Sequence, residues 1–333
     1  MRIIAIMVLA ALVQITSAQT KITKPYVTPD DLKAWVSYLA SDDMKGRLNG
    51  SVEMEEAAEW LAKKFKEFDL EPLEGFNSYI HNYTLKGRRE SFPERNVLGF
   101  IEGRDPKLKD EYILITAHFD HIGIRKAVEG DSIYNGADDN AAGTSTLLGV
   151  AKAIKEGKMK PGRSIIFASV SGEEMGLHGS RELAKNPPFS LENVYVNVNF
   201  EMTGHSEEYG KGNYYTTGCS YTNLDDQIQK FNKGKNINLI DTIAIAERLF
   251  FASDNAAFAR LKKEGDINIG IPGATFATTT MGSHIHKPSD EVELFDLDNM
   301  ATLVNYFAEM VVWLSNSREF IDWTNPSFKR LED

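Results

Sequence analysis

Histidines and acidic residues follow several apolar, strand-like runs in this chain of 333 residues. They occur in the segments TAHFDHIG, GADDNAAG, SGEEMG, NFEMTG and SHIHKPSDE, and the side chains concerned are His118, Asp139, Glu173, Glu174, Glu201 and His286. Imidazole and carboxylate groups are the ligands that proteins offer to zinc, and a carboxylate next to a ligand can serve as a general base. The pattern therefore predicts a hydrolase with two metal ions.

Segments with strand and helix patterns alternate along the chain and must position these side chains. We expect strands over 96–101, 112–117, 164–170 and 194–200, and helices over 51–68, around 147–154, after 174 and over 300–314. Strands that alternate with helices are typical of a mostly parallel sheet with helices on both faces. We therefore predict an α/β fold with a mostly parallel central sheet.

Three of the expected strands end directly before candidate ligands. The strands that end at residues 117, 170 and 200 are followed by His118, by Glu173 and Glu174, and by Glu201. Ligands of open α/β sheets bind beyond the carboxyl ends of the strands. Because strand ends are polar in any case, one such residue is weak evidence for a metal site. The evidence is that candidate ligands follow three separate strands.

The first 18 residues have the pattern of an export signal. Met1 and Arg2 precede an apolar run from Ile3 to Val13, and small residues follow up to Ala18. An uncleaved anchor is the alternative, but spanning a membrane takes roughly 20 apolar residues. We expect cleavage after Ala18, export to the periplasm or the extracellular space, and no stable membrane insertion afterwards.

Composition predicts a single acidic catalytic domain over residues 19–333. This range contains no linker-like stretch, internal repeat or second long apolar segment. The formal net charge of -11 and the lack of a basic cluster argue against nucleic acid or an anionic membrane as partner. Cys219 is the only cysteine, so the fold has no intramolecular disulfide and depends on its core. The sequence carries no signal for an oligomeric state.

The motifs resemble those of the co-catalytic di-zinc aminopeptidases, a family that also includes glutamate carboxypeptidases and glutaminyl cyclases. The similarity runs, in the family's order, from LASD and the pair Gly46-Arg47 through AHFDHIG, GADDNAAG, SGEEMGLHGS, NFEMTG and SDNAAFA to HKPSDE. It implies a zinc aminopeptidase-like α/β/α sandwich. It also implies an exopeptidase that releases N-terminal residues from peptides with a free N-terminus.

The resemblance assigns a ligand role to five residues. His118 and Glu201 would bind one zinc ion, Glu174 and His286 would bind the second, and Asp139 would bridge the two. The three carboxylates and one hydroxide between the ions would carry four negative charges, which balance the four positive charges of two zinc ions. The inner shell is then neutral, which a partly dry cleft tolerates.

Two further residues would support these ligands. Glu173 would be the general base that takes a proton from the bridging water and returns it to the leaving amine. Asp120 would hydrogen-bond the second ring nitrogen of His118 and so orient that ligand.

Several neighbours of the motifs have alternative roles. Spacing alone does not choose between Asp138 and Asp139, and the resemblance favours Asp139 as the bridge because the family's bridging acid directly precedes an Asn-Ala-Ala-Gly-like stretch. Asp138 is then open between a solvated or helix-capping acid and another role. His284 belongs to the pocket wall or the surface, because the pattern His-x-Pro-x-Asp fits His286. Asp254 lines the substrate pocket by resemblance, or caps the following helix.

One further histidine lies near the motifs, and two positions differ from the residues that the family has there. We expect His121 to be a structural residue or a residue that supports a ligand, rather than a ligand itself, since the five assigned residues already fill the metal shell. Many members have aspartate in place of Glu201, and several have an oxyanion-stabilising tyrosine where this chain has Ile285. The oxyanion donor is therefore open between zinc and His284.

Other classes of function fit less well. The chain lacks a G-x-S-x-G elbow, a P-loop, a dinucleotide fingerprint and an H-E-x-x-H helix. A carboxypeptidase or a glutaminyl cyclase on the same scaffold is one alternative, although cyclases of this family use a single zinc ion. A catalytically silent zinc-binding or receptor protein is the other, and zinc content discriminates it from the enzyme.

Overall fold

The computed structural model describes residues 25–87, 90–280 and 282–331. The expected export signal, residues 1–18, lies outside the described residues, and the single domain over 19–333 stays a prediction. Within the described ranges, no helix combines the length and the apolar character that crossing a membrane requires.

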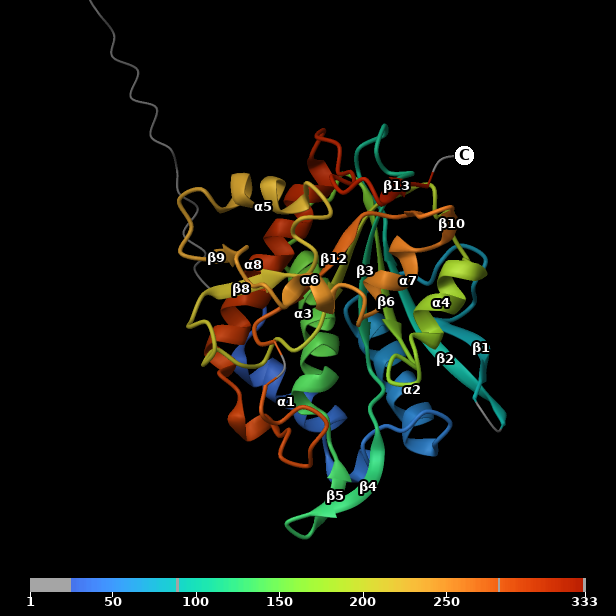
Figure 1. Cartoon of the computed structure of the whole chain (residues 1–333), viewed down its shortest axis with the longest axis vertical. Coiled ribbons are helices and arrows are strands. Elements are labelled where there is room, and N and C mark those ends of the chain that lie inside the picture. The colour runs from blue at the N-terminus through green and yellow to red at the C-terminus, as the bar shows by residue number, and fades with distance from the viewer. Residues whose placement is uncertain (1–24, 88–89, 281, 332–333) are drawn as a thin grey trace, which may run out of the picture.

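A mixed sheet of eight strands forms the centre of the described part of the chain, in the order β1-β2-β6-β3-β7-β12-β8-β9 (Figure 1). These strands are β1 (Ile80–Lys86), β2 (Ser91–Ile101), β3 (Tyr112–His118), β6 (Ser164–Val170), β7 (Val194–Phe200), β8 (Asn213–Thr216), β9 (Asn238–Ile240) and β12 (Gly273–Ala277). The central strands β6, β3, β7 and β12 are parallel, whereas β2 and β8 run antiparallel to their inner neighbours. The prediction of an α/β fold with a central parallel sheet is confirmed.

Helices cover both faces of this sheet. Their bounds are α1 (Pro29–Leu39), α2 (Val52–Glu67), α3 (Gly143–Glu156), α4 (His178–Lys185), α5 (Leu224–Asn232), α6 (Ala246–Leu249), α7 (Asn255–Ala259) and α8 (Leu297–Asn316). Ile113 and Ile115 of β3 join the core formed with α1, α2, α3 and α8, while Leu114 joins the core formed with α4 and α7. Because successive strand residues point to opposite faces, each central strand is buried on both sides.

The first two helices begin where their sequences provide a cap. Thr28 accepts a hydrogen bond from the backbone of Asp31, whose carboxylate accepts from the backbone of Thr28 in return. At α2 the hydroxyl of Ser51 accepts a hydrogen bond from the backbone of Met54, without a reciprocal bond. The apolar stripe of α2 is buried against the sheet, which confirms the helix expected over 51–68.

Short elements outside the main sheet complete the fold. The strands β10 (Lys262–Glu264), β11 (Ile267–Gly270) and β13 (Phe328–Arg330) form a small sheet, and β4 (Gly123–Val128) pairs with β5 (Asp131–Tyr134). Figure 1 shows the β4-β5 hairpin projecting from the body of the molecule. This hairpin lies in the sequence between the AHFDHIG and GADDNAAG motifs.

Candidate metal centre

The carboxyl ends of three neighbouring parallel strands deliver the candidate ligands to one edge of the sheet. His118 is the last residue of β3, Glu173 and Glu174 follow β6, and Glu201 follows β7. Because β6, β3 and β7 are adjacent and parallel, these side chains converge. This is the arrangement expected from the sequence.

A first group of donor atoms consists of His118, Asp139 and Glu201. The Nε2 atom of His118 lies 3.4 Å from Oδ1 of Asp139 and 3.5 Å from Oε1 of Glu201. All three donor atoms lie within 4.8 Å of one another. These are the residues that the resemblance assigns to one zinc ion.

A second group uses the other oxygen of Asp139. The Nε2 atom of His286 lies 3.1 Å from Oδ2 of Asp139 and 3.2 Å from Oε1 of Glu174. His121 joins this group, because its Nδ1 atom lies 2.9 Å from the same Glu174 oxygen and 3.7 Å from Oδ2 of Asp139. The five predicted ligands thus form two groups that share Asp139, and His121 contacts the second group, as either a residue that supports a ligand or a ligand itself would. Their role as ligands stays a prediction.

The two groups fit zinc. Ligands at about 2.0 Å around a tetrahedral zinc ion are about 3.3 Å apart, and the measured donor separations lie on both sides of this value. The buried atoms Nε2 of His118, Nδ1 of His121 and Oε1 of Glu174 have no hydrogen-bond partner among the described residues. Unpaired polar atoms are costly to bury, and coordination to a cation removes that cost.

Several acidic groups of this centre have shifted pKa values that follow from burial and crowding. Burial raises the pKa of Glu173 well above its usual range, and the charges of Glu201, Asp254 and Glu174 add to the effect. Burial also acts to raise the pKa of Asp139, but His118 and His286 outweigh it and hold this pKa well below its usual range. The lowered pKa keeps Asp139 in the anionic form that a bridge between two cations requires.

Asp120 fixes the loop that carries the two glutamates. Its carboxylate accepts hydrogen bonds of 3.2 Å from the backbone N–H groups of Glu173 and Glu174. The resemblance predicted that this carboxylate hydrogen-bonds His118, but Oδ1 lies 3.6 Å from Nδ1, and the backbone carbonyl of Asp120 is nearer, at 3.3 Å. The predicted hydrogen bond between this carboxylate and His118 is therefore corrected, because the carboxylate turns toward the loop of Glu173 and Glu174.

Asp290 positions the bridging residue and was not among the predicted site residues. Its carboxylate accepts hydrogen bonds from the backbone of Asp138, at 2.8 Å, and of Asp139, at 3.1 Å. The signal was present in the motif HKPSDE, where this aspartate follows His286 by four residues. Asp138 itself is buried and accepts a hydrogen bond from the backbone of Gly204, so it is not a solvated acid.

Arg47 ties together the loops around the centre. Its fully buried guanidinium donates hydrogen bonds to the backbone carbonyls of Phe119, Leu39, Asn135 and Gly136. Burial lowers its pKa to about 10, so the side chain stays charged at neutral pH. Arg47 therefore places a buried positive charge close to the acidic residues of the centre, among them Asp120, Asp139 and Asp290.

A pocket of about 190 Å³ opens directly on the ligands. Besides Asp139, Glu173, Glu174, Glu201 and His286, its wall contains Met202, Tyr215, Thr217, Leu249, Ala252, Thr275, Ala277, Thr280 and Ile285. Apart from the metal-centre residues, this wall is neutral. Ile285 occupies the position of the family's tyrosine and offers no hydrogen-bond donor from its side chain.

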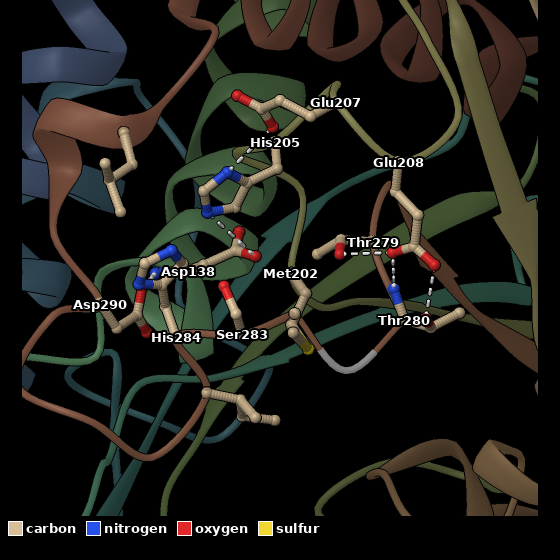
Figure 2. A pocket seen from close by; sticks show the side chains of 13 residues that line it. Asp138, Met202, His205, Glu207, Glu208, Thr279, Thr280, Ser283, His284 and Asp290 are labelled. Carbon is tan, nitrogen blue, oxygen red and sulfur yellow. Dashed lines mark hydrogen bonds and ion pairs between the residues drawn. The ribbon is translucent and has the colours of Figure 1, made fainter.

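A second pocket of about 550 Å³ lies next to the first and contains His284. Figure 2 shows Asp138 and His205 facing each other in this pocket and Glu208 bound to Thr279 and Thr280. His284 lies 2.9 Å from the hydroxyl of Ser289, away from the ligand-lined pocket. His284 thus lines this neighbouring pocket and not the ligand-lined one, and its predicted role toward the substrate stays a prediction.

Asp254 does not line either pocket. Its side chain is fully buried and accepts a hydrogen bond of 2.6 Å from Ser180, which explains why it is absent from the pocket walls. It makes no capping hydrogen bond to α7 either. Burial raises its pKa to about 7, so this carboxyl is a buried neighbour of the centre, and its predicted role in the substrate pocket is wrong.

Comparison with solved structures defines the class of fold. The LapA aminopeptidase of Legionella pneumophila aligns with a TM-score of 0.63 and 21% identity over 88% of this chain and 73% of that chain. The glutaminyl cyclase of Porphyromonas gingivalis aligns with a TM-score of 0.65 and 16% identity over 87% of this chain and 100% of that chain. The fold is therefore that of the zinc aminopeptidases, as predicted.

Sequence comparison then gives the family. The profile described as Peptidase family M28 matches residues 96–311, and the chain belongs to this family of zinc metallopeptidases. A probable leucine aminopeptidase of Trichophyton verrucosum is 24% identical over 253 residues, which are 74% of this chain and 62% of that protein. The chain thus matches about three fifths of the length of this relative. The predicted resemblance is confirmed.

Proposed function

We propose that this chain is an exported zinc exopeptidase that removes N-terminal residues from peptides by means of two zinc ions. The observation that carries the proposal is the pair of donor groups that share Asp139 beside a neutral pocket. The probable leucine aminopeptidase among the relatives and the aminopeptidase among the structural neighbours support the same reaction.

His118, Asp139 and Glu201 would hold one ion, and Asp139, Glu174 and His286 the other. Bound zinc supplies Lewis acidity toward a carbonyl and brings the pKa of water close to neutral. The protein supplies a fixed frame for both ions, because Asp290 and Asp120 hold the backbone of the ligand loops through hydrogen bonds.

Glu173 is the residue of the centre best placed to move protons. It lies in the wall of the ligand-lined pocket but in neither donor group. Burial raises its pKa, which brings a carboxyl closer to the range in which it accepts and returns a proton at neutral pH. Glu173 would therefore take a proton from the attacking water and deliver it to the leaving amine.

The ligand-lined pocket favours a neutral side chain at the substrate's first position. Leu249, Ala252 and Ala277 provide apolar wall, while the hydroxyl of Tyr215 is already bound to the carbonyl of Thr279. No charged side chain other than those of the metal centre lines this pocket. A lysine or an aspartate at this position would lose its hydration without gaining a partner.

Hydrolysis of aminoacyl fluorophores tests the reaction. A panel of side chains, each with a free and an acetylated amino end, should be assayed with chelator and after zinc is restored. We expect cleavage of free, neutral substrates only, with activity lost to chelator and recovered with zinc. Cleavage of neither set, or of the acetylated set as well, would contradict an aminopeptidase.

A glutaminyl cyclase is the second candidate, because the P. gingivalis cyclase aligns over its whole length. A single zinc ion would need only one of the two donor groups, so the second group favours the peptidase. Peptides that begin with glutamine discriminate the two, since the cyclase releases ammonia and leaves the chain length unchanged, while the peptidase releases the first residue.

Export is the part of the proposal that rests on residues 1–18 alone. Expression with the native first 18 residues, followed by N-terminal sequencing of the exported product, tests it. We expect the mature chain to begin at Gln19. Retention of Met1 inside the cell would contradict export.

A further inference from the structure

We propose that His121 is a fourth protein ligand of one zinc ion and binds it through Nδ1, an inference that rests on the proposed two-zinc site. The ion concerned is the one held by Asp139, Glu174 and His286. The two zinc positions then differ in kind, since one has four protein ligands and the other has three.

The donor atoms of this group have the spacing of a tetrahedron. Nδ1 of His121 lies 2.9 Å from Glu174 and 3.7 Å from Asp139, and Nε2 of His286 lies 3.2 Å and 3.1 Å from the same two oxygens. The edge of a zinc tetrahedron is about 3.3 Å. His121 therefore occupies a corner, as the three assigned ligands do.

A hydrogen bond from His121 to Glu174 is the alternative explanation of the short distance. The ring geometry does not support it, because neither nitrogen of the fully buried imidazole makes a hydrogen bond among the described residues. Oε1 of Glu174 is likewise without a hydrogen bond. Two unpaired atoms that lie 2.9 Å apart and do not point at each other are arranged as two ligands of one cation are.

The surrounding backbone fixes the position of the imidazole. The N–H of His121 donates a hydrogen bond of 3.2 Å to the carbonyl of Arg47. On the opposite side lies Gly136, where a Cβ atom would come within 2.4 Å of Cγ of His121. Only a residue without a side chain leaves room for the ring at this point, so the fold brings His121 to the donor group and keeps it there.

The difference between the positions has a chemical consequence. Structural zinc sites have four protein ligands, whereas catalytic sites keep one position for water or substrate. The ion bound by His121 and its three partners is thus held mainly by protein. The position of His118, Asp139 and Glu201 is the one that keeps room for substrate, and it should bind zinc more weakly.

Histidine nitrogen shifts test the assignment directly. Long-range proton–nitrogen spectra of the mature chain, labelled at histidine, should be recorded before and after zinc is added. We expect the zinc-induced shift at Nδ1 of His121 and at Nε2 of His118 and His286. A His121 ring whose nitrogens do not respond to zinc would overturn the inference, and this result does not depend on the folding of any variant.

Zinc affinity of variants provides the second measurement. In His121→Asn the amide can still donate to Glu174 but cannot replace an imidazole ligand, so we expect the tighter dissociation constant to weaken by more than the roughly 10- to 100-fold that loss of a supporting residue costs. His205→Ala, in the neighbouring pocket, is the matched control and should keep both constants. Unchanged zinc affinity in His121→Asn would show that His121 only positions Glu174.

The outcomes separate this inference from the proposed function. Wild-type chain that binds two zinc ions with no response from His121 contradicts the inference alone. Wild-type chain that binds a single ion through His121 supports the ligand assignment and contradicts the two-zinc function.

Discussion

Glu173 and Glu174 are adjacent in sequence but have different surroundings. Glu174 contacts His121 and His286 in a donor group, while Glu173 lines the pocket and remains outside both groups. The backbone N–H groups of both residues donate hydrogen bonds to Asp120, which holds them in place while their side chains point to different neighbours. The proposed division between Glu174 as ligand and Glu173 as base therefore depends on the directions in which the two side chains point.

Substitution of Glu173 tests this division. We expect Glu173→Gln to keep its zinc and its fold and to lose at least about 100-fold in kcat, because an amide accepts no proton. The measurement is kcat together with zinc content, with Glu207→Gln as a control that removes one charge from the neighbouring pocket. Loss of zinc from Glu173→Gln would show that Glu173 is a ligand and that its role must be exchanged with that of Glu174.

At the scale of elements, the loops around the centre depend on Arg47. Lysine offers fewer donors and no planar fork, so Arg47→Lys leaves backbone carbonyls buried without partners. We expect it to lower the free energy of unfolding by about 3 kcal/mol and to weaken zinc binding. Urea unfolding measures the change, and the exposed Arg248→Lys is the control. A variant as stable as wild type would show that the carbonyls find other partners.

The contact between α5 and β8 makes stability depend on pH. The half-buried carboxylate of Asp225 accepts a hydrogen bond of 2.7 Å from Thr216, and burial raises its pKa to about 6. An acid whose pKa is raised by folding stabilises the fold below its unfolded pKa near 4, and this contribution is lost as the pH rises through 6.

Asp225→Asn removes this dependence, because the amide still accepts from Thr216 and carries no charge. Relative to wild type, the variant should gain up to about 3 kcal/mol between pH 4 and pH 7. Urea unfolding at several pH values measures the gain, and Asp226→Asn, which removes the same charge from an exposed neighbouring position, is the control. A difference that does not change with pH would contradict the raised pKa.

At the scale of the whole molecule, we expect bound zinc to contribute to the stability of the fold. Six acidic side chains converge there, and they are Asp138, Asp139, Glu173, Glu174, Glu201 and Asp290. Removal of zinc leaves their charges opposed mainly by Arg47 and the histidines. An ion bound only by the folded state adds about 4 kcal/mol when its free concentration is 1,000 times its dissociation constant.

We therefore expect a chelator to lower the Tm by on the order of 10 °C for this chain. Differential scanning calorimetry of zinc-loaded, chelated and reloaded protein measures the change. Equal Tm values for samples that differ in measured zinc content would contradict the dependence.

The sequence predicted the fold better than it predicted the individual side chains of the site. Period-2 and helical patterns reflect burial on sheet and helix faces, so strands such as 164–170 and the helix over 51–68 were correct. The direction of one imidazole or carboxylate depends on neighbours distant in sequence. His121 lies next to Glu174, 53 residues later, and Asp254 is buried against Ser180, 74 residues earlier, and neither contact has a local signal.

The β4-β5 hairpin projects from the body of the molecule (Figure 1), so its length can vary independently of the geometry of the metal centre. Its two ends meet the body where Gly46 packs against Gly123 and Tyr134, while its β4 strand is largely exposed. The residues between these ends can therefore be lengthened, shortened or replaced without moving His121 or Asp139. The hairpin is a place where a lineage can add a surface feature, or an engineer a fluorescent tag, at little risk to the catalytic apparatus.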